Sequence, residues 1–232
     1  MTQTVLVTRP RIEAETTAAD LERRGCDALI APMVEVQPAS FELPEETRSL
    51  IVTSKNGARH GLSMIPQKGR PVYAVGQATA DECKRLGFTN VSVGPGTAKG
   101  LIPVLSESGI KVKRQYTWLS GEDTAYDIAG VLQNQGIDAE RLVTYRTRAA
   151  QGFPTDVTVA LDQGDVDAVL FYSARAATIF EELVSELEKT WWLKKLDAIT
   201  MSARVSDNLI GPWASIRHAV LPTELSLFKL LG

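Results

Sequence analysis

Small polar residues occupy six turns of this chain, and each turn follows an apolar run that is predicted to form a strand. The turns are Thr8-Arg9-Pro10, Thr53-Ser54-Lys55-Asn56-Gly57, Gly76-Gln77-Ala78-Thr79, Leu119-Ser120-Gly121-Glu122, Tyr172-Ser173-Ala174-Arg175 and Ser202-Ala203-Arg204. In open parallel sheets, ligands bind beyond the carboxyl ends of the strands, because helix N-termini there offer free N–H groups and a positive dipole end. A single turn of this type is usually only a helix cap. Six of them favour a surface that binds an acidic ligand with several carboxylates, largely through backbone amides.

Tyr145 is the candidate for proton transfer, because a phenol with a pKa of about 10 can donate a proton without carrying charge at neutral pH. It lies in the alternating segment from Val143 to Arg148, which is predicted to join two lobes of the protein. The alternative stays open that Tyr145 packs in a hinge and takes no part in chemistry.

Other chemical motifs are incomplete. His60 and His218 have no partner at metal-ligand spacing, and no GxSxG pattern marks a nucleophilic serine. The run from Gly94 to Gly100 matches neither the GxGxxG nor the Walker pattern, so it is interpreted as a turn before a helix. Cys26 and Cys83 lack CxxC spacing and are expected to be reduced. The sequence therefore predicts no metal site and no nucleotide cofactor.

The six turns belong to an alternation of short apolar runs and helix-period segments, which predicts βα units and parallel sheets. The predicted strands are Val5 to Thr8, Ala28 to Ala31, Leu50 to Thr53, Val72 to Val75, Val91 to Val93, Tyr116 to Leu119, Arg141 to Thr144, Ala168 to Tyr172, Ala198 to Met201 and Ala219 to Leu221. The predicted helices are Glu13 to Arg24, Lys55 to Met64, Ala78 to Leu86, Ala98 to Ser106, Ala125 to Gln135, Ala174 to Glu188, Arg204 to Leu209 and Glu224 to Leu231. Gly25, Gly87 and Gly136 follow three of these helices, where a left-handed cap residue is favoured.

Two pairs of similar segments within the sequence indicate two related lobes. The segment from Thr4 to Val36 is similar to the segment from Gln115 to Thr147, and the segment from Ala74 to Gly87 is similar to the segment from Thr200 to Gly211. Two α/β lobes are the simplest explanation of this self-similarity.

The alternating segments that begin at Met33 and Val143 predict a two-stranded bridge between the lobes. The sequence thus predicts a discontinuous first domain over 1–33 and 153–232, an inserted second domain over 44–144, and a linker over 34–43 and 145–152. The strands divide evenly between the lobes, which suits small doubly wound parallel sheets with helices on both faces.

The composition excludes several classes of protein. The 232 residues are 44% hydrophobic and 23% charged, as in an ordinary globular protein. The net charge of −3 disfavours a nucleic-acid-binding surface. The first apolar run is too short for a signal peptide, and no segment approaches the roughly 20 apolar residues of a membrane span. We expect a cytoplasmic protein without nucleic-acid or membrane partners.

Seven short motifs, which cover nearly the whole chain in order, resemble the uroporphyrinogen-III synthase family. They are VLVTRP at Val5 to Pro10, DLERRG at Asp20 to Gly25, VTSKNG at Val52 to Gly57, VYAVGQATA at Val72 to Ala80, LSG at Leu119 to Gly121, VTYRT at Val143 to Thr147 and LFYSARA at Leu170 to Ala176. Each string is degenerate, but their order and spacing together are fairly specific. The resemblance implies an α/β fold of two flavodoxin-like parallel-sheet domains joined by a two-stranded β linker. It also implies a monomeric lyase of porphyrin (haem) biosynthesis that needs no cofactor and no metal.

The resemblance further implies a substrate and the residues that bind it. Members of the family bind hydroxymethylbilane, a linear tetrapyrrole polycarboxylate, between the lobes, mostly through main-chain amides and hydroxyl groups. The linker tyrosine of the family falls on Tyr145, the candidate for assisting loss of the substrate hydroxyl. The substrate-binding positions carried over by motif are Thr8, Arg9, Ser54, Asn56, Gly76, Thr79, Ser120, Gly121, Ser173, Arg175 and Ser202. The loop at Ser202 departs from the pattern, because Val205 stands where a threonine hydroxyl is expected, and Ser202 or Ser206 is the candidate to replace it.

The implied reaction closes the bilane with inversion of its last ring, ring D, to give uroporphyrinogen III, whereas in water the chain closes head to tail. Such a reaction depends on orientation and control of charge more than on a strong nucleophile, in agreement with the lack of an obvious catalytic cluster. The alternative function is that of a two-lobed cytosolic protein that binds a small anionic metabolite without catalysis.

Overall fold

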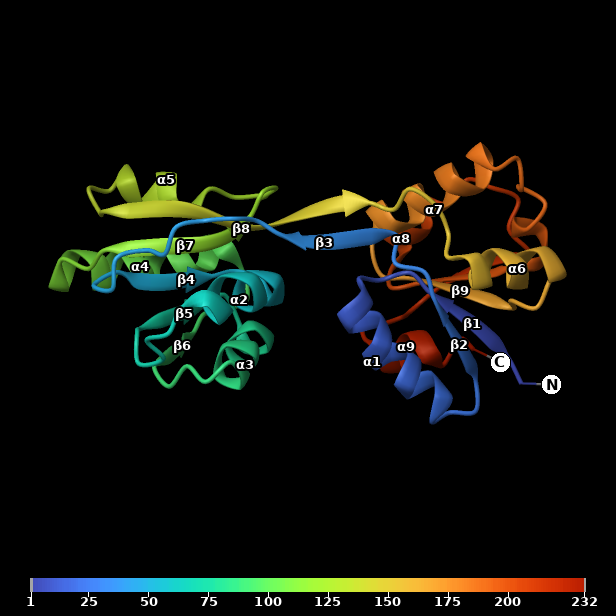
Figure 1. Cartoon of the computed structure of the whole chain (residues 1–232), viewed down its shortest axis with the longest axis horizontal. Coiled ribbons are helices and arrows are strands. Elements are labelled where there is room, and N and C mark those ends of the chain that lie inside the picture. Colours follow the sequence, from blue (N-terminus) through green and yellow to red (C-terminus); the bar gives the residue numbers. More distant parts are fainter. Residues whose placement is uncertain (1, 232) are drawn as a thin grey trace. The chain divides into compact units, whose positions relative to one another are not determined.

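The computed structural model describes residues 2–231, and the chain divides into two compact units. The first unit contains the residues up to Glu35 together with those from Arg148 onward, and the second unit contains Val36–Thr147. Each unit is built on a parallel sheet with helices on both faces (Figure 1).

The first unit has five parallel strands in the order β11-β10-β9-β1-β2. The strands are β1 (Thr4–Val7), β2 (Asp27–Ile30), β9 (Ala168–Phe171), β10 (Asp197–Thr200) and β11 (Ser215–His218). The helices are α1 (Arg11–Glu22), α6 (Thr155–Gln163), α7 (Ala174–Glu186), α8 (Ala203–Ser206) and α9 (Glu224–Phe228), with a 3₁₀ turn at Leu193–Lys195.

Both faces of this first sheet are buried. Leu6 of β1 packs in a core with Phe180 of α7, while Val5 and Val7 face a second core that contains Leu21 of α1. A strand covered on both faces carries a continuous apolar run, and for this reason β1 and β9 can be predicted from the sequence.

The second unit has six strands in the order β3-β8-β7-β4-β5-β6. The strands are β3 (Val34–Pro38), β4 (Ser49–Val52), β5 (Val72–Ala74), β6 (Val91–Val93), β7 (Tyr116–Gly121) and β8 (Ala139–Ala149). The helices are α2 (Lys55–Gly61), α3 (Gln77–Arg85), α4 (Ala98–Val112) and α5 (Ile128–Gln133), with a 3₁₀ turn at Leu62–Met64. One core lies between the sheet and α4 with α5, and the other lies between the sheet and α2 with α3.

The chain passes between the units twice, along β3 and along the end of β8, which are neighbours in the sheet (Figure 1). The backbone N–H of Ala39 donates to the carbonyl of Thr144, and the N–H of Ala150 donates to the carbonyl of Met33. The partner residues run in opposite directions, so the two segments are antiparallel. The predicted fold class, two parallel α/β sheets with a two-stranded β linker, is confirmed.

The local signals at helix ends are also confirmed. Gly25, Gly87 and Gly136 have φ values of 83°, 90° and 75°, so each occupies the left-handed region after its helix.

Two element predictions are wrong. The last strand of the first unit is Ser215–His218 rather than 219–221, because this edge strand is half exposed and lacks the apolar run that marks a buried strand. The helix α6 is absent from the predicted helices, because its residues TDVTVALDQ alternate like a strand. Burial of Val157 and Leu161 against the core stabilises the helix there.

Several predicted helix bounds differ from the structure. The helix α4 runs to Val112 rather than to Ser106. The helix α5 begins only at Ile128, because the side chain of Asp127 accepts a hydrogen bond from the N–H of Gly130 and caps it.

No helix within residues 2–231 combines the length and the hydropathy that crossing a membrane would require.

Candidate functional site

The predicted site residues of the second unit lie at one edge of its sheet. The strands β7, β4 and β5 are parallel neighbours, so their carboxyl ends meet at that edge. Ser120 and Gly121 are the last residues of β7. Ser54 and Asn56 follow β4, and Gly76 and Thr79 follow β5, where the chain enters α2 and α3.

The first unit has an equivalent edge. Its strands β1, β9 and β10 are neighbours, and the turns at their carboxyl ends carry the remaining predicted residues. These are Thr8 and Arg9 after β1, Ser173 and Arg175 after β9, and Ser202 after β10. Ser173 is exposed and caps α7, where its hydroxyl accepts a hydrogen bond of 3.2 Å from the N–H of Ala176.

Tyr145 joins the edge of the second unit from the neighbouring strand β8. It pairs with Gly121 of β7 just beyond a shift in the β7–β8 register. Its phenol oxygen lies 3.0 Å from Oγ of Ser54. A Cβ atom placed on Gly121 would lie 2.6 Å from Cζ of Tyr145, so the tyrosine ring rests directly on the glycine backbone. Ser54, Gly121 and Tyr145 therefore form one cluster, which we call the Tyr145 cluster.

The local sequence around Ser54 explains how this residue reaches the tyrosine. Ser54 is the N-cap of α2, and its Oγ accepts a hydrogen bond of 2.9 Å from the N–H of Gly57. A Cβ atom at Gly57 would lie only 2.8 Å from the carbonyl oxygen of Leu119, so a glycine is needed for α2 to pack this closely on β7. The close packing brings the capping hydroxyl beside the end of β7.

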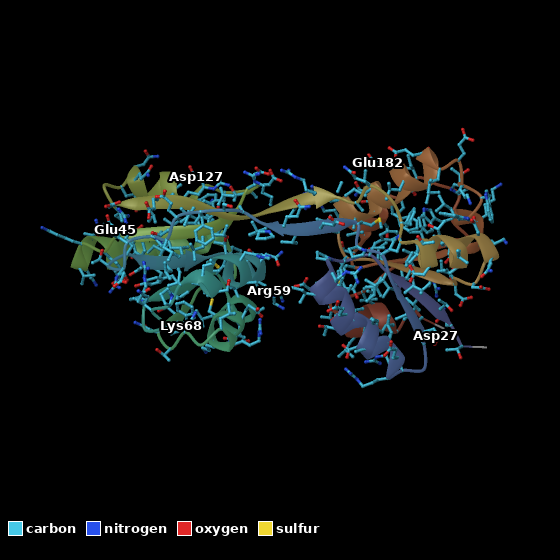
Figure 2. The ribbon with its side chains drawn as sticks, viewed as in Figure 1. Asp27, Glu45, Arg59, Lys68, Asp127 and Glu182 are labelled. Carbon is cyan, nitrogen blue, oxygen red and sulfur yellow. The ribbon has the colours of Figure 1, made fainter. Side chains whose placement is uncertain are left out.

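His60 of α2 borders the Tyr145 cluster, and its ring centroid lies 6.0 Å from that of Tyr145. Burial lowers the pKa of His60 below its ordinary value of 6.5, and the neighbouring Arg59 guanidinium lowers it further. Arg59 itself, labelled in Figure 2, pairs with the buried carboxylate of Glu82 at 3.0 Å. A neutral imidazole therefore stands beside the phenol at neutral pH.

Arg141 of β8 is a site residue that the sequence analysis missed. Its guanidinium donates to the carbonyls of Gly121 and Glu122 at 2.8 and 2.5 Å, and to Oγ of Ser120 at 2.9 Å. The guanidinium also lies over the ring of Trp118, 5.4 Å from its centroid. Arg141 thus fixes the end of β7, on which the tyrosine ring rests.

Three of the predicted hydroxyl residues are buried within their own units. Thr8 is fully buried and donates to the carbonyl of Leu170 at 2.6 Å. Ser120 is buried and donates to the carbonyl of Gly121 at 3.0 Å, and Thr79 is buried at the start of α3. The hydroxyls of Thr8 and Ser120 consequently hold the turns in place.

Arg9 is paired with a carboxylate of its own unit. Its Nη1 lies 2.6 Å from Oε1 of Glu224, and its guanidinium carbon lies 4.2 Å from the ring centroid of Tyr172. The same Glu224 oxygen accepts hydrogen bonds from Thr17 and Tyr172 at 2.8 and 3.1 Å. Burial raises the pKa of Tyr172, so its phenol stays protonated and donates. Glu224 lies far from Arg9 in the sequence, and no local signal predicts this pairing.

Two serines in the loop after β10, Ser202 and Ser206, are the candidates to replace the expected threonine hydroxyl. Only the hydroxyl of Ser202 is left available to a ligand. The Ser206 hydroxyl lies 2.7 Å from that of Thr200, which also donates to the carbonyl of Ser202 at 3.1 Å. Ser202 is the N-cap of α8, and its side chain makes no capping hydrogen bond.

Within residues 2–231, no three His, Cys, Asp or Glu side chains gather as a metal site would require.

Comparisons with known proteins agree on one family. The family model described as "Uroporphyrinogen-III synthase HemD" matches residues 15–229. A curated protein of Chlorobaculum parvum named uroporphyrinogen-III synthase is 26% identical over 203 residues, which span 80% of this chain and 81% of that protein. The crystal structure of uroporphyrinogen-III synthetase from Helicobacter pylori aligns with a TM-score of 0.63 at 19% identity, covering 99% of this chain and 98% of that one. At this identity the structural likeness establishes the fold.

The pairing of Arg9 with Glu224 predicts a stabilising role for both residues. Arg9→Ala and Glu224→Ala should each lower the free energy of unfolding by about 1–2 kcal/mol, because each leaves a partly buried charge without its partner. The double variant should cost less than the sum of the two single variants. Urea unfolding measures these values, and Arg11→Ala, at an exposed arginine of α1, serves as the control. An Arg9→Ala variant as stable as wild type would contradict this role.

His60 predicts a pH-dependent stability with a defined sign. The pKa is lower in the folded state, so the unfolded state binds more protons as the pH falls below about 6.5, and stability decreases there. The wild type should therefore lose stability relative to His60→Gln as the pH falls from 7 to 5. Measuring both proteins by urea unfolding across this range tests the sign, together with the titration of His60 by NMR. A titration midpoint at or above 6.5 would refute the prediction.

Proposed function

The chain belongs to the uroporphyrinogen-III synthase family, whose model matches nearly its whole length, and from this membership we infer how its residues carry out the reaction. The protein is a uroporphyrinogen-III synthase, a cyclising lyase of tetrapyrrole biosynthesis. A binding protein without catalysis is not favoured, because the matching family and the curated relative are both named for an enzyme.

We propose that the substrate is hydroxymethylbilane and that the product is uroporphyrinogen III with ring D inverted. The terminal hydroxymethyl carbon loses its hydroxyl group, and the pyrrole nitrogen supplies the electron pair that makes an electron-deficient azafulvene. The substituted carbon of the last ring then attacks, and the spiro intermediate fragments and recloses. The protein has to fold the bilane so that this carbon, rather than the free end, reaches the azafulvene.

Tyr145 is the proposed proton donor to the departing hydroxyl group. Hydroxide is a poor leaving group, and protonation allows it to depart as water. The support comes from the placement of the phenol at the carboxyl edge of the second sheet, in contact with Ser54 and Gly121. Ser54 and Gly121 consequently border the reacting end of the bound bilane.

The acetate and propionate groups of the substrate are proposed to bind at the carboxyl edges of the two sheets. In the second unit the turns with Asn56, Gly76 and Thr79 offer backbone N–H groups. In the first unit the exposed residues Ser173 and Arg175 are the proposed contacts. Backbone amides suit this task because they are fixed in position before the substrate arrives.

The remaining residues at the edge of the first unit have more limited roles in this proposal. Ser202 is the hydroxyl of its loop that we assign to the substrate, because Ser206 is bonded to Thr200. Thr8 and Arg9 shape the loop after β1 through their internal hydrogen bonds.

We further propose that the protein acts as a cytoplasmic monomer without metal, cofactor or nucleic acid. The net charge of −3 supports the absence of a nucleic-acid partner, and the lack of nucleotide and metal-ligand motifs in the sequence supports the absence of a cofactor and a metal.

The isomer composition of the product tests the proposed function. The purified chain, treated with a chelator, is supplied with hydroxymethylbilane as it forms, and the oxidised porphyrins are separated by chromatography. We expect the type III isomer to predominate, and heat-inactivated protein should leave the head-to-tail type I isomer. Formation of type I alone by the folded protein, even with tight binding of the bilane, would refute the proposal and support a binding protein.

A further inference from the structure

The hydroxyl of Ser54 makes two hydrogen bonds, and the direction of one of them is fixed. The N–H of Gly57 donates to Oγ at 2.9 Å, and the phenol oxygen of Tyr145 lies at 3.0 Å from the same atom. A serine hydroxyl carries one proton and two lone pairs, and the amide of Gly57 must use a lone pair. The serine proton is therefore left available for Tyr145.

Two arrangements of the Ser54–Tyr145 hydrogen bond exist, and they differ in what the phenol can do. If the phenol donates to Ser54, its proton is occupied and the substrate meets only an acceptor. If Ser54 donates to the phenol oxygen, the phenol proton is free to point toward the substrate. Only the second arrangement is compatible with Tyr145 as an acid.

We propose that Ser54 is a positioning residue that acts through Tyr145, by donating its proton to the phenol oxygen while the phenol donates to the departing hydroxyl. The inference rests on the proposed function, since it assumes that Tyr145 is the acid. It replaces the expectation that Ser54 serves mainly to bind a substrate carboxylate.

The protons and electrons of the step balance. The O–H bond of Tyr145 breaks, its proton joins the hydroxyl oxygen of the substrate, and the C–O bond breaks with its electron pair leaving on water. The resulting phenolate is stabilised by the hydrogen bond from Ser54, because a donor favours the charged form of its acceptor. After the spiro intermediate fragments, the formerly free α-carbon of the last ring closes the macrocycle and loses its proton, and this proton restores the phenol.

The surroundings hold this geometry on several sides. Gly57 fixes Oγ of Ser54 through the cap, and the backbone of Gly121 supports the tyrosine ring. Arg141 clamps the carbonyls of Gly121 and Glu122, and the N–H of Glu122 donates to the carbonyl of Tyr145 at 2.9 Å. The phenol and the serine hydroxyl are therefore aligned before the substrate binds, which is the condition for an orientational contribution to the rate.

A double-mutant cycle on kcat tests this coupling directly. Ser54→Ala should lower kcat for type III formation by about tenfold or more, with little change in KM. Tyr145→Phe should lower kcat at least as far. Adding Ser54→Ala to Tyr145→Phe should then produce no further loss, because Ser54 acts only through the phenol.

Three further variants separate positioning from helix capping. Ser54→Thr keeps both the cap and the hydroxyl proton and should retain most of the rate. Ser54→Asp keeps a capping acceptor but cannot donate when ionised, so it should fold and still lose kcat. Thr97→Ala removes the cap of α4, where the hydroxyl accepts from the N–H of Gly100. Both Thr97→Ala and Ser54→Ala should lower the thermal midpoint by about 2–4 °C, but Thr97→Ala should leave kcat unchanged.

Several results would overturn the inference. A raised KM with unchanged kcat in Ser54→Ala would assign Ser54 to carboxylate binding. If Ser54→Ala lowered kcat by the same factor in the wild-type and Tyr145→Phe backgrounds, the two residues would act independently. A fully active Tyr145→Phe variant would also contradict the inference, because Ser54 would then have no acid to position. In each of these cases the wild type would still form the type III isomer, so a failure here is distinct from a failure of the proposed function.

Discussion

The register of β8 on β7 is the constraint on which the candidate site depends. The two strands pair regularly from Tyr116 to Ser120, and Thr144 is then the extra residue that brings Tyr145 opposite Gly121. Thr144 is buried and donates to the carbonyl of Ser120 at 3.2 Å, which fixes the irregularity. A bulge of this kind redirects a side chain at the end of a strand. Here it places a phenol where α2 presents its capping serine, so the proposed chemistry depends on the same contacts as the fold.

The polar residues at the strand ends divide into those that shape the turns and those that can meet a ligand. Thr8, Ser120 and Arg9 make hydrogen bonds within their own units, and these bonds hold the loops in fixed conformations. In the proposed function, these loops bind the carboxylates of the substrate through backbone N–H groups. A rigid surface of this kind suits a reaction in which the conformation of the substrate decides the product, because little reorganisation is needed as charge develops.

The sequence predicts the fold well because the signals for it are local. Buried parallel strands carry apolar runs, and Gly25 and Gly136 mark helix ends through their left-handed conformation. The turns of the candidate site follow from the same alternation. Contacts between distant residues have no such signal: the pairing of Arg9 with Glu224 and that of Ser54 with Tyr145 depend on sheet order and on a bulge. The helix α6 has no local signal either, because its residues alternate like a strand and become helical through packing against the core.

The backbone of Gly121 and the hydroxyl of Ser54 hold the Tyr145 phenol in its proposed working position. The most direct measurement is kcat for type III formation by Gly121→Ala, in which the added Cβ would lie 2.6 Å from Cζ of Tyr145 and must displace the ring. We expect kcat to fall between about tenfold and a hundredfold. Gly69→Ala, where nothing lies within 4 Å of the added atom, should leave kcat unchanged. A Gly121→Ala protein with wild-type kcat would contradict the account.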